Sequence, residues 1–222
     1  MHKRLVGAIF FAVLLVCGTV AEAADRKFPD KIDPAKRYMF YMHGTYVERQ
    51  GPFEKYAYYE ILESIEKQGF VVIGEARSLT NAGHYAKLLA KQVQQLLDEG
   101  VPSYQITVAG HSKGGMITMN VAAKLGQTGV NYVVFAGCGL PGKEYLRGYS
   151  KFVENEAHEI DGKCLIAWAS DDEFAGNCDA AMKKGKADFD NKILPAGLGG
   201  HKIFYSPNPV WMNELITFAK GG

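Results

Sequence analysis

The sequence predicts an α/β fold: a three-layer sandwich in which a mostly parallel sheet of six strands, or slightly more, is covered by helices on both faces. Short apolar runs alternate with longer amphipathic segments along almost the whole chain, and this order is typical of parallel sheets. The chain has 222 residues, 47% of them hydrophobic and 22% charged. That composition suits one domain with a sizeable core, and no internal repeat or linker divides it.

Six short runs rich in apolar and β-branched residues are predicted to be strands. In chain order they are residues 37–42, 70–73, 105–109, 131–136, 163–169 and a weaker run at 188–194. In parallel sheets of this kind, functional groups gather at the carboxyl ends of the strands. The segments that follow the predicted strands are therefore the place to look for chemistry.

Four segments carry apolar residues at helical spacing. They are residues 53–68, 82–99, 113–125 and 209–220. Gly69 and Gly100 mark the ends of the first two. Asn208 suits the N-cap of the last helix, and Gly221 suits its C-terminal end. Residues 139–160 read as irregular or helical, and we expect them to form a short flap rather than a large cap.

The first 23 residues have the pattern of a cleaved signal peptide. Lys3 and Arg4 are followed by an apolar stretch from 5 to 20, and Ala21-Glu22-Ala23 fits a small-x-small cleavage site. The apolar stretch is short for a membrane span, although a retained anchor is the alternative. We therefore expect export to a periplasm or the exterior, no stable membrane insertion after cleavage, and one domain over 24–222.

Charge excludes one class of partner. The net charge is +1, and no basic face stands out, so we expect no nucleic-acid partner. Removing residues 1–23 takes away two basic residues and one acidic residue, which leaves a mature charge of zero. A monomer and a small homo-oligomer both fit this sequence.

Three cysteines follow the predicted signal peptide, and an exported protein meets an oxidising environment. An odd number leaves at least one thiol free within a single chain. Cys138 and Cys178 both fall just past the ends of strands that should be neighbours, so we consider a disulfide between them, with three free thiols as the alternative. Cys164 begins its strand and is expected to be a buried thiol.

One motif points to a nucleophile. Gly110-His111-Ser112-Lys113-Gly114 fits the pattern G-x-S-x-G, and it lies between a predicted strand and a predicted helix. Glycines permit a sharp bend that exposes the Ser112 hydroxyl at the start of the helix. There the backbone N–H of Lys113 points toward a developing oxyanion. The alternative is a glycine-rich turn without chemistry.

A serine nucleophile needs a base, and the base needs a carboxylate to orient it. His201 follows the last predicted strand and a glycine-rich loop, whereas His158 lies in a polar stretch before the fifth strand. We therefore expect His201 to be the base. Asp171 and Asp172 both follow the fifth strand; we favour Asp172 as the acid and keep Asp171 as the alternative.

An oxyanion hole needs a second N–H donor, from the loop after the first core strand. That loop reads His43-Gly44-Thr45-Tyr46, and we expect the N–H of Thr45 to donate, with Gly44 beside it. His43 either braces this loop or lines the substrate pocket, which Tyr46 and Tyr145 are also candidates to line. The side chain of Lys113 either reaches solvent or attracts an anionic group of the substrate.

Taken together, the "GHSKGG" bend, the "HGTY" loop, the acids of "ASDDEF" and the histidine of "GGHKIF" resemble the α/β-hydrolase superfamily over roughly residues 37–220. The resemblance implies a Ser-His-Asp triad, here Ser112, His201 and Asp172, and hydrolysis through an acyl-enzyme. The chain is similar in size to small esterases and lacks room for the usual first hairpin. The expected substrate is a small ester, with a thioester, an amide or a peptide as alternatives on the same triad.

Other chemistry is poorly supported. The stretch 137–142 matches the pattern G-x-G-x-x-G, but it follows the fourth predicted strand, and a lone match is weak evidence for a dinucleotide site. No metal-binding motif is present in the sequence, so we expect neither a cofactor nor a metal. A protein that keeps the fold for binding, without catalysis, is the third class of function to consider.

Overall fold

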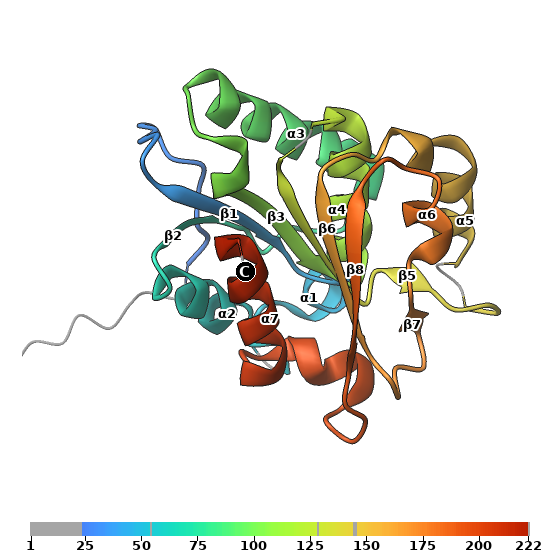
Figure 1. Ribbon diagram of the computed structural model, residues 1–222. Coiled ribbons are helices and arrows are strands. Elements are labelled where there is room, and N and C mark those ends of the chain that lie inside the picture. The colour runs from blue at the N-terminus through green and yellow to red at the C-terminus, as the bar shows by residue number, and fades with distance from the viewer. Residues whose placement is uncertain (1–23, 54, 128, 144–145, 222) are drawn as a thin grey trace, which may run out of the picture.

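A computed structural model describes residues 24–53, 55–127, 129–143 and 146–221. Its centre is a six-stranded sheet in the order β2-β1-β3-β4-β6-β8, in which every neighbouring pair is parallel (Figure 1). The strands are β1 (Arg37–Met42), β2 (Phe70–Ile73), β3 (Ile106–His111), β4 (Asn131–Phe135), β6 (Lys163–Ala169) and β8 (Asp188–Leu194). The predicted fold class is confirmed.

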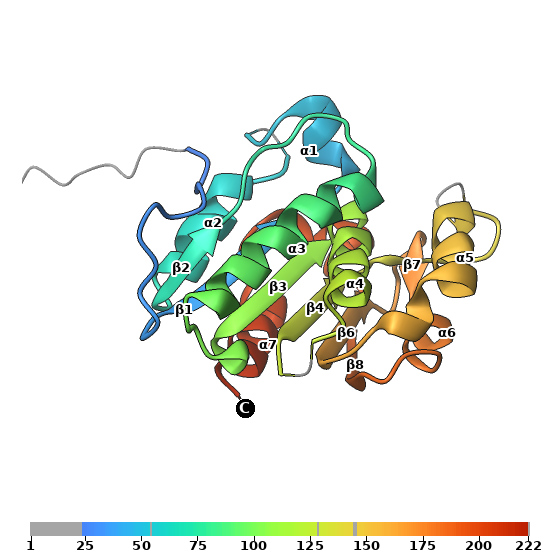
Figure 2. The same ribbon diagram turned by 90° about the horizontal axis from the view of Figure 1, so that it is seen from above.

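Helices cover both faces of the sheet, as Figure 2 shows from above. On one face, α3 (Ala82–Asp98), α4 (Lys113–Leu125) and α5 (Leu146–Asn155) share a core with the strands. On the other face, α2 (Tyr58–Glu66) and α7 (Pro209–Lys220) share a second core with them. The central strands are therefore buried on both sides, whereas the edge strand β8 is mostly exposed.

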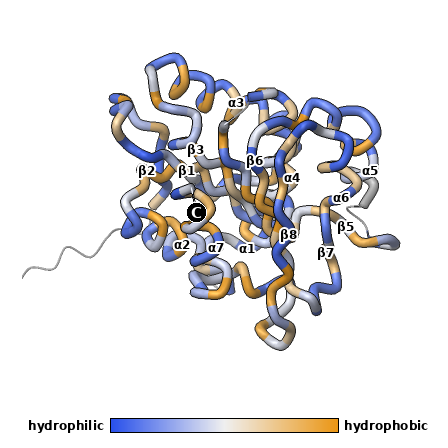
Figure 3. The backbone as a smooth tube through the Cα atoms, viewed as in Figure 1, coloured by the Kyte–Doolittle hydropathy of each residue, from blue (hydrophilic) through white to orange (hydrophobic). Residues whose placement is uncertain are grey.

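Strand β1 shows why the strands read as continuous apolar runs. Tyr38, Phe40 and Met42 belong to the core under α3 and α4, whereas Met39 and Tyr41 belong to the core under α2 and α7. Because successive side chains of a strand point to opposite faces, a strand that is buried on both faces has no polar positions to alternate with. Figure 3 shows the resulting concentration of apolar residues in the middle of the sheet.

The prediction for residues 53–68 was wrong at its start. Helix α2 begins only at Tyr58, and a separate short helix, α1 (Thr45–Gln50), directly follows the loop after β1. Gly51 ends α1 with a φ of 88°, a value that favours glycine, and Pro52 comes next. This break ends α1, and the ion pair between Glu48 of α1 and Lys113 shows that α1 lies beside the carboxyl end of β3.

A two-stranded ribbon and a short helix lie beside the main sheet. The two-residue strand β5 (Cys138–Gly139) pairs antiparallel with β7 (Ala175–Gly176), and the short helix α6 (Asp179–Met182) follows β7. A disulfide joins Cys138 to Cys178 beside this ribbon, with 5.3 Å between the two Cα atoms. Cys164 is free and buried.

The chain before β1 lies along the edge of the sheet. Arg26 exchanges two backbone hydrogen bonds with Gly74, of 2.7 and 2.8 Å, just past the end of β2. The predicted signal peptide, residues 1–23, lies outside the described residues. Within the part of the chain that the structure describes, no helix has the length and apolar character needed to cross a membrane.

Candidate active site

The predicted catalytic residues meet at one edge of the sheet. Strand β1 leads into Gly44 and β3 leads into Ser112, while β6 leads into Asp172 and the chain after β8 carries His201. All of these strands are parallel, so their carboxyl ends lie side by side. Residues far apart in the sequence therefore share one location.

Ser112 sits in a strained bend between β3 and α4. Its φ and ψ are 57° and −117°, in a region that residues with a side chain adopt rarely. A Cβ on Gly110 would lie 2.4 Å from the backbone of Gly114, and one on Gly114 would lie 2.1 Å from the carbonyl oxygen of Met42. These contacts explain physically why the motif needs glycine on both sides of the serine.

Asp172 and His201 form what we call the acid–base arm. The Nδ1–H of His201 donates to Oδ2 of Asp172 at 2.8 Å, and the carboxylate is completely buried. Its other oxygen accepts the backbone N–H groups of Phe174 and Ala175, at 2.8 and 3.0 Å. A carboxylate only accepts hydrogen bonds, so Nδ1 carries the proton and Nε2 is left free to act as a base.

The neighbouring Asp171 has a different partner. Its side chain is exposed and accepts the backbone N–H of Gly197 at 2.8 Å. The carboxylate thus holds the start of the loop that leads to His201, while Asp172 holds the imidazole itself. His158 lies on the surface, where its imidazole is 3.1 Å from Glu159.

Ser112 and His201 both line a cavity of about 850 Å³. No hydrogen bond joins the two side chains among the described residues. Such bonds are often long in enzymes without substrate and tighten when substrate binds. The remaining lining residues are Gly44, Thr45, Tyr46, Arg49, Gln50, Lys55, His111, Phe174 and Tyr205.

The loop after β1 closes on the nucleophile. A Cβ on Gly44 would lie 3.0 Å from Cβ of Ser112, so a larger residue here would push against the nucleophile. Thr45 and Lys113 are the first residues of α1 and α4. In the described part of the chain, neither of their N–H groups donates to another backbone group, as expected at a helix start.

His43 does not line the cavity, which corrects its assignment to the substrate pocket. Its side chain is completely buried; Nδ1 donates to the carbonyl of Gly44 at 2.9 Å, and Nε2 accepts the backbone N–H of Arg77 at 3.0 Å. Burial, together with the positive charge of Arg77, lowers the pKa of His43 to about 3. The residue is a neutral brace for the loop, the other role considered for it.

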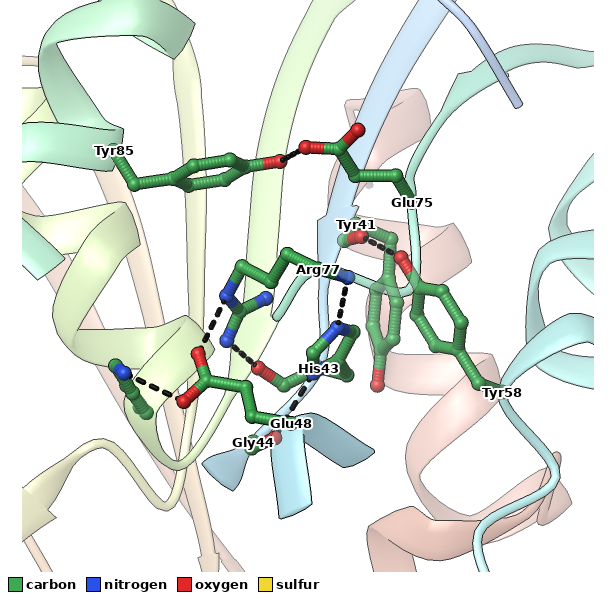
Figure 4. Close-up of polar contacts among 9 residues, drawn as sticks. Tyr41, His43, Gly44, Glu48, Tyr58, Glu75, Arg77 and Tyr85 are labelled. Atoms are coloured by element: carbon green, nitrogen blue, oxygen red, sulfur yellow. Dashed lines mark hydrogen bonds and ion pairs between the residues drawn. The ribbon is translucent and has the colours of Figure 1, made fainter. Parts of the chain in front are cut away.

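A buried ion-pair network lies behind this loop (Figure 4). Glu48 of α1 accepts Nε of Arg77 at 2.9 Å with one oxygen and Nζ of Lys113 at 2.6 Å with the other. Arg77 also donates through Nη2 to the carbonyl of His43. We call His43, Glu48, Arg77 and Lys113 the His43 network; Lys113 therefore points to Glu48 rather than to solvent or substrate.

His111, directly before the nucleophile, is also held neutral. Its ring is completely buried, and burial together with the nearby His201 lowers its pKa well below the ordinary value. Nδ1 lies 3.2 Å from the hydroxyl of Tyr56, and the ring centroid lies 4.6 Å from that of His201. The imidazole of His201 packs against that of His111.

The walls of the cavity come mostly from residues that the sequence analysis did not single out. Tyr46 lines it as expected and packs on Tyr205, with 5.2 Å between the ring centroids. Phe174 forms another wall, with its ring 5.4 Å from that of His201. Tyr145 lies outside the described residues. None of the described residues 139–143 and 146–160 lines this cavity.

The glycine pattern at 137–142 has a packing explanation. A Cβ on Gly137 would lie 2.6 Å from Cγ1 of Val134 and 3.0 Å from the backbone of Gly115 in α4. Gly137 therefore allows helix α4 to pack closely after the bend at Ser112. Among the described residues, no group of three or more His, Cys, Asp or Glu side chains is arranged to hold a metal ion.

Comparison with known proteins identifies the fold. No family model and no curated sequence matches the chain. Among solved structures, a phospholipase/carboxylesterase from Dyadobacter fermentans superposes with a TM-score of 0.55 at 14% identity, covering 87% of this chain and 97% of that one. A putative dienelactone hydrolase from Klebsiella pneumoniae reaches 0.54 at 12% identity, covering 86% and 90%.

An acetyl xylan esterase from Paenibacillus is similar to the same degree. Its TM-score is 0.55 at 11% identity, covering 86% of this chain and 76% of that one. All three are α/β-hydrolase-type proteins, and the protein described here has the α/β-hydrolase fold.

Proposed function

We propose that the protein is a serine hydrolase that cleaves carboxylic esters. The observation that carries this proposal is the convergence of the strained Ser112 and the acid–base arm on one cavity. A serine at such a bend, a histidine with one free ring nitrogen and a buried carboxylate that orients it are the parts that acyl transfer requires. The ester-cleaving structural neighbours support the same reaction class.

The mechanism follows from these positions. Oγ of Ser112 attacks the ester carbonyl carbon while Nε2 of His201 takes the hydroxyl proton. The N–H groups of Thr45 and Lys113 stabilise the negative oxygen of the tetrahedral intermediate. The carbon–oxygen bond to the alcohol then breaks, and His201 returns the proton to the departing alkoxide. Water, deprotonated by His201, then attacks the acyl carbon; the bond from that carbon to Oγ of Ser112 breaks, His201 returns the proton to Oγ, and the acid leaves.

Asp172 makes this cycle efficient without changing its own protonation state. The carboxylate fixes the tautomer of His201 and stabilises the imidazolium that forms in each half-reaction. The cavity that receives the substrate is open and has aromatic walls, a size and character that suit a small ester better than a long buried lipid chain.

Labelling with a fluorophosphonate tests the proposal directly, because such probes react only with an activated serine. We expect one adduct per chain, located by mass spectrometry at Ser112, and parallel hydrolysis of p-nitrophenyl acetate. Ser112→Ala should abolish labelling and lower kcat by several orders of magnitude. A folded wild-type protein that is neither labelled nor active would point to a binding function instead. A panel of ester, thioester and amide substrates would then rank the leaving groups.

We also propose that the protein is exported and loses residues 1–23. The basic and apolar pattern of that segment supports this, and so does the disulfide between Cys138 and Cys178, since disulfides persist in oxidising compartments. N-terminal sequencing of the protein recovered from periplasm or medium should begin at Ala24. A chain that keeps Met1 and stays inside the cell would contradict the proposal.

A further inference from the structure

Glu48 is unusual among the acidic residues of this protein because both of its oxygens pair with cations from distant parts of the chain. Arg77 Nε lies 2.9 Å from Oε1 and Lys113 Nζ lies 2.6 Å from Oε2. The Glu48 side chain is completely buried, and that of Arg77 is only 3% exposed. Burying three charges has a large desolvation cost, so this arrangement calls for an explanation beyond stability.

The position of Glu48 links the two halves of the proposed oxyanion hole. It lies three residues after Thr45 in α1, and Lys113 is the first residue of α4. The carboxylate therefore connects the helix that begins with one N–H donor to the residue that carries the other. Figure 4 shows Arg77 extending this connection, because it reaches both Glu48 and His43.

Arg77 fixes the loop from its other side. Its guanidinium donates to the carbonyl of His43, and its backbone N–H donates to Nε2 of the same residue at 3.0 Å. His43 in turn donates to the carbonyl of Gly44. The carbonyl and both ring nitrogens of His43 are thus held by contacts that lead through Arg77 to Glu48.

We propose that Glu48 is a positioning residue that holds the N–H groups of Thr45 and Lys113 at the separation that an oxyanion requires. This inference rests on the proposed function. Donors stabilise an oxyanion only within a narrow range of distances, and a misplacement of about 1 Å costs about 100-fold in rate. A buried carboxylate between two cations restrains such shifts better than exposed contacts do.

The charges of this cluster allow position to be separated from electrostatics. Arg77 and Lys113 carry two positive charges and Glu48 one negative charge, which leaves a net +1 behind the hole. Glu48→Gln raises this to +2, and Lys113→Met lowers it to zero while keeping the backbone N–H. If the charge alone mattered, the two variants would change the rate in opposite directions; if position matters, both lose activity.

The test compares kcat and KM of E48Q, K113M and the double variant on p-nitrophenyl acetate. We expect each single variant to lose about 10- to 100-fold in kcat, less than the 10²- to 10³-fold loss for removing a donor outright. KM should change by less than about threefold, and the double variant should be no worse than the poorer single one. Lys113→Arg, which keeps a cation within reach of Glu48, should restore most of the rate.

Lys124→Met provides the matched control. Lys124 lies in the same helix, forms a 3.0 Å ion pair with Glu156, and is 22% exposed, against 20% for Lys113. Its loss should leave kcat unchanged. The affinity of a boronic acid that mimics the tetrahedral intermediate should fall in parallel with kcat/KM in K113M and stay unchanged in K124M.

Three results would overturn the inference: wild-type kcat in K113M, a rate in E48Q equal to or above that of the wild type, or additive losses in the double variant. Should circular dichroism show that E48Q is unfolded, the loss in K113M and its rescue in K113R decide the question alone. A wild-type protein that labels at Ser112, with unaffected variants, rejects only this inference. An unlabelled, inactive wild type rejects the proposed function with it.

Discussion

The acid–base arm and the His43 network each contain a histidine beside the same cavity, yet their surroundings give the two imidazoles opposite roles. His201 has one ring nitrogen on Asp172 and the other free, and its side chain is 12% exposed. His43 is completely buried, and backbone groups occupy both of its nitrogens. A histidine with a free nitrogen at a cavity can move protons, whereas one with both nitrogens engaged can only hold structure.

The carboxylates differ in the same way. Asp172 faces one imidazole and two backbone N–H groups, so it can respond to a change of charge on His201. Glu48 faces two fixed cations. We infer that the acid–base arm serves the chemical step and that the His43 network serves the geometry of the site. Four measurements would break or sharpen this comparison.

The largest expected effect is on catalysis by the acid–base arm. Asp172→Asn should lower kcat on p-nitrophenyl acetate by about 10⁴-fold, because the amide favours the wrong tautomer of His201. Asp171→Asn is the matched control: its amide oxygen can still accept the N–H of Gly197, and the loss should stay below about tenfold. Equal losses in both variants would refute the assignment of Asp172 as the acid.

Next comes the stability that depends on the His43 network. Arg77→Met leaves the buried Glu48 with one cation and removes the donor to the carbonyl of His43, so we expect a loss of about 3–5 kcal/mol in the free energy of unfolding. Arg26→Met breaks the more exposed pair of Arg26 with Glu66 and should cost about 1 kcal/mol or less. Urea denaturation measures the free energy of unfolding of both variants. Similar losses would show that burial does not make the His43 network more important for stability than an exposed ion pair.

A somewhat smaller effect is expected from the disulfide that supports the acid–base arm. Asp172 accepts hydrogen bonds from the backbone N–H groups of Phe174 and Ala175. These two residues lead into β7, and Cys178 follows β7. Replacing Cys138 and Cys178 together by alanine should destabilise the protein by about 2–4 kcal/mol, because the bridge closes a long loop in the unfolded chain. The double variant should keep wild-type kcat when folded; Cys164→Ala serves as the control without a bridge.

The smallest effect, counted per pH unit, is the pH dependence of stability. The pKa of His43 is lowered to about 3 in the folded protein, below the ordinary value of about 6.5. Between these values the unfolded chain binds the extra proton, so His43 stabilises the fold above pH 6.5 and that contribution falls toward pH 3. The expected slope is about 1.4 kcal/mol per pH unit.

Replacing His43 by glutamine should lower the slope of the free energy of unfolding between pH 4 and 7 by that amount, and leave the part that comes from the buried His111, whose pKa is also lowered. His158→Gln, on the surface, should leave it unchanged. If the slope in the His43 variant equals that of the wild type, the buried neutral state described for that imidazole does not contribute to the acid sensitivity.

Local sequence was sufficient to predict the six strands of the central sheet, four of the helices and the candidates for the triad. Six apolar runs and a glycine-flanked serine are signals within a few residues, because burial on both faces of a sheet and a sharp bend each restrict the residues allowed there. The order of serine, acid and base along the chain then indicated His201, and the choice of Asp172 over Asp171 agrees with the hydrogen bond to Nδ1.

The tertiary structure alone decided which polar side chains are partners. Glu48 lies 29 residues before Arg77 and 65 residues before Lys113, and no local pattern links the three residues. Helix α1, the cavity walls formed by Phe174 and Tyr205, and the burial of His43 were likewise not visible in the sequence. Charge pairing and burial depend on which strands and helices become neighbours. The packing of the whole chain determines those neighbours, and no short segment does so alone.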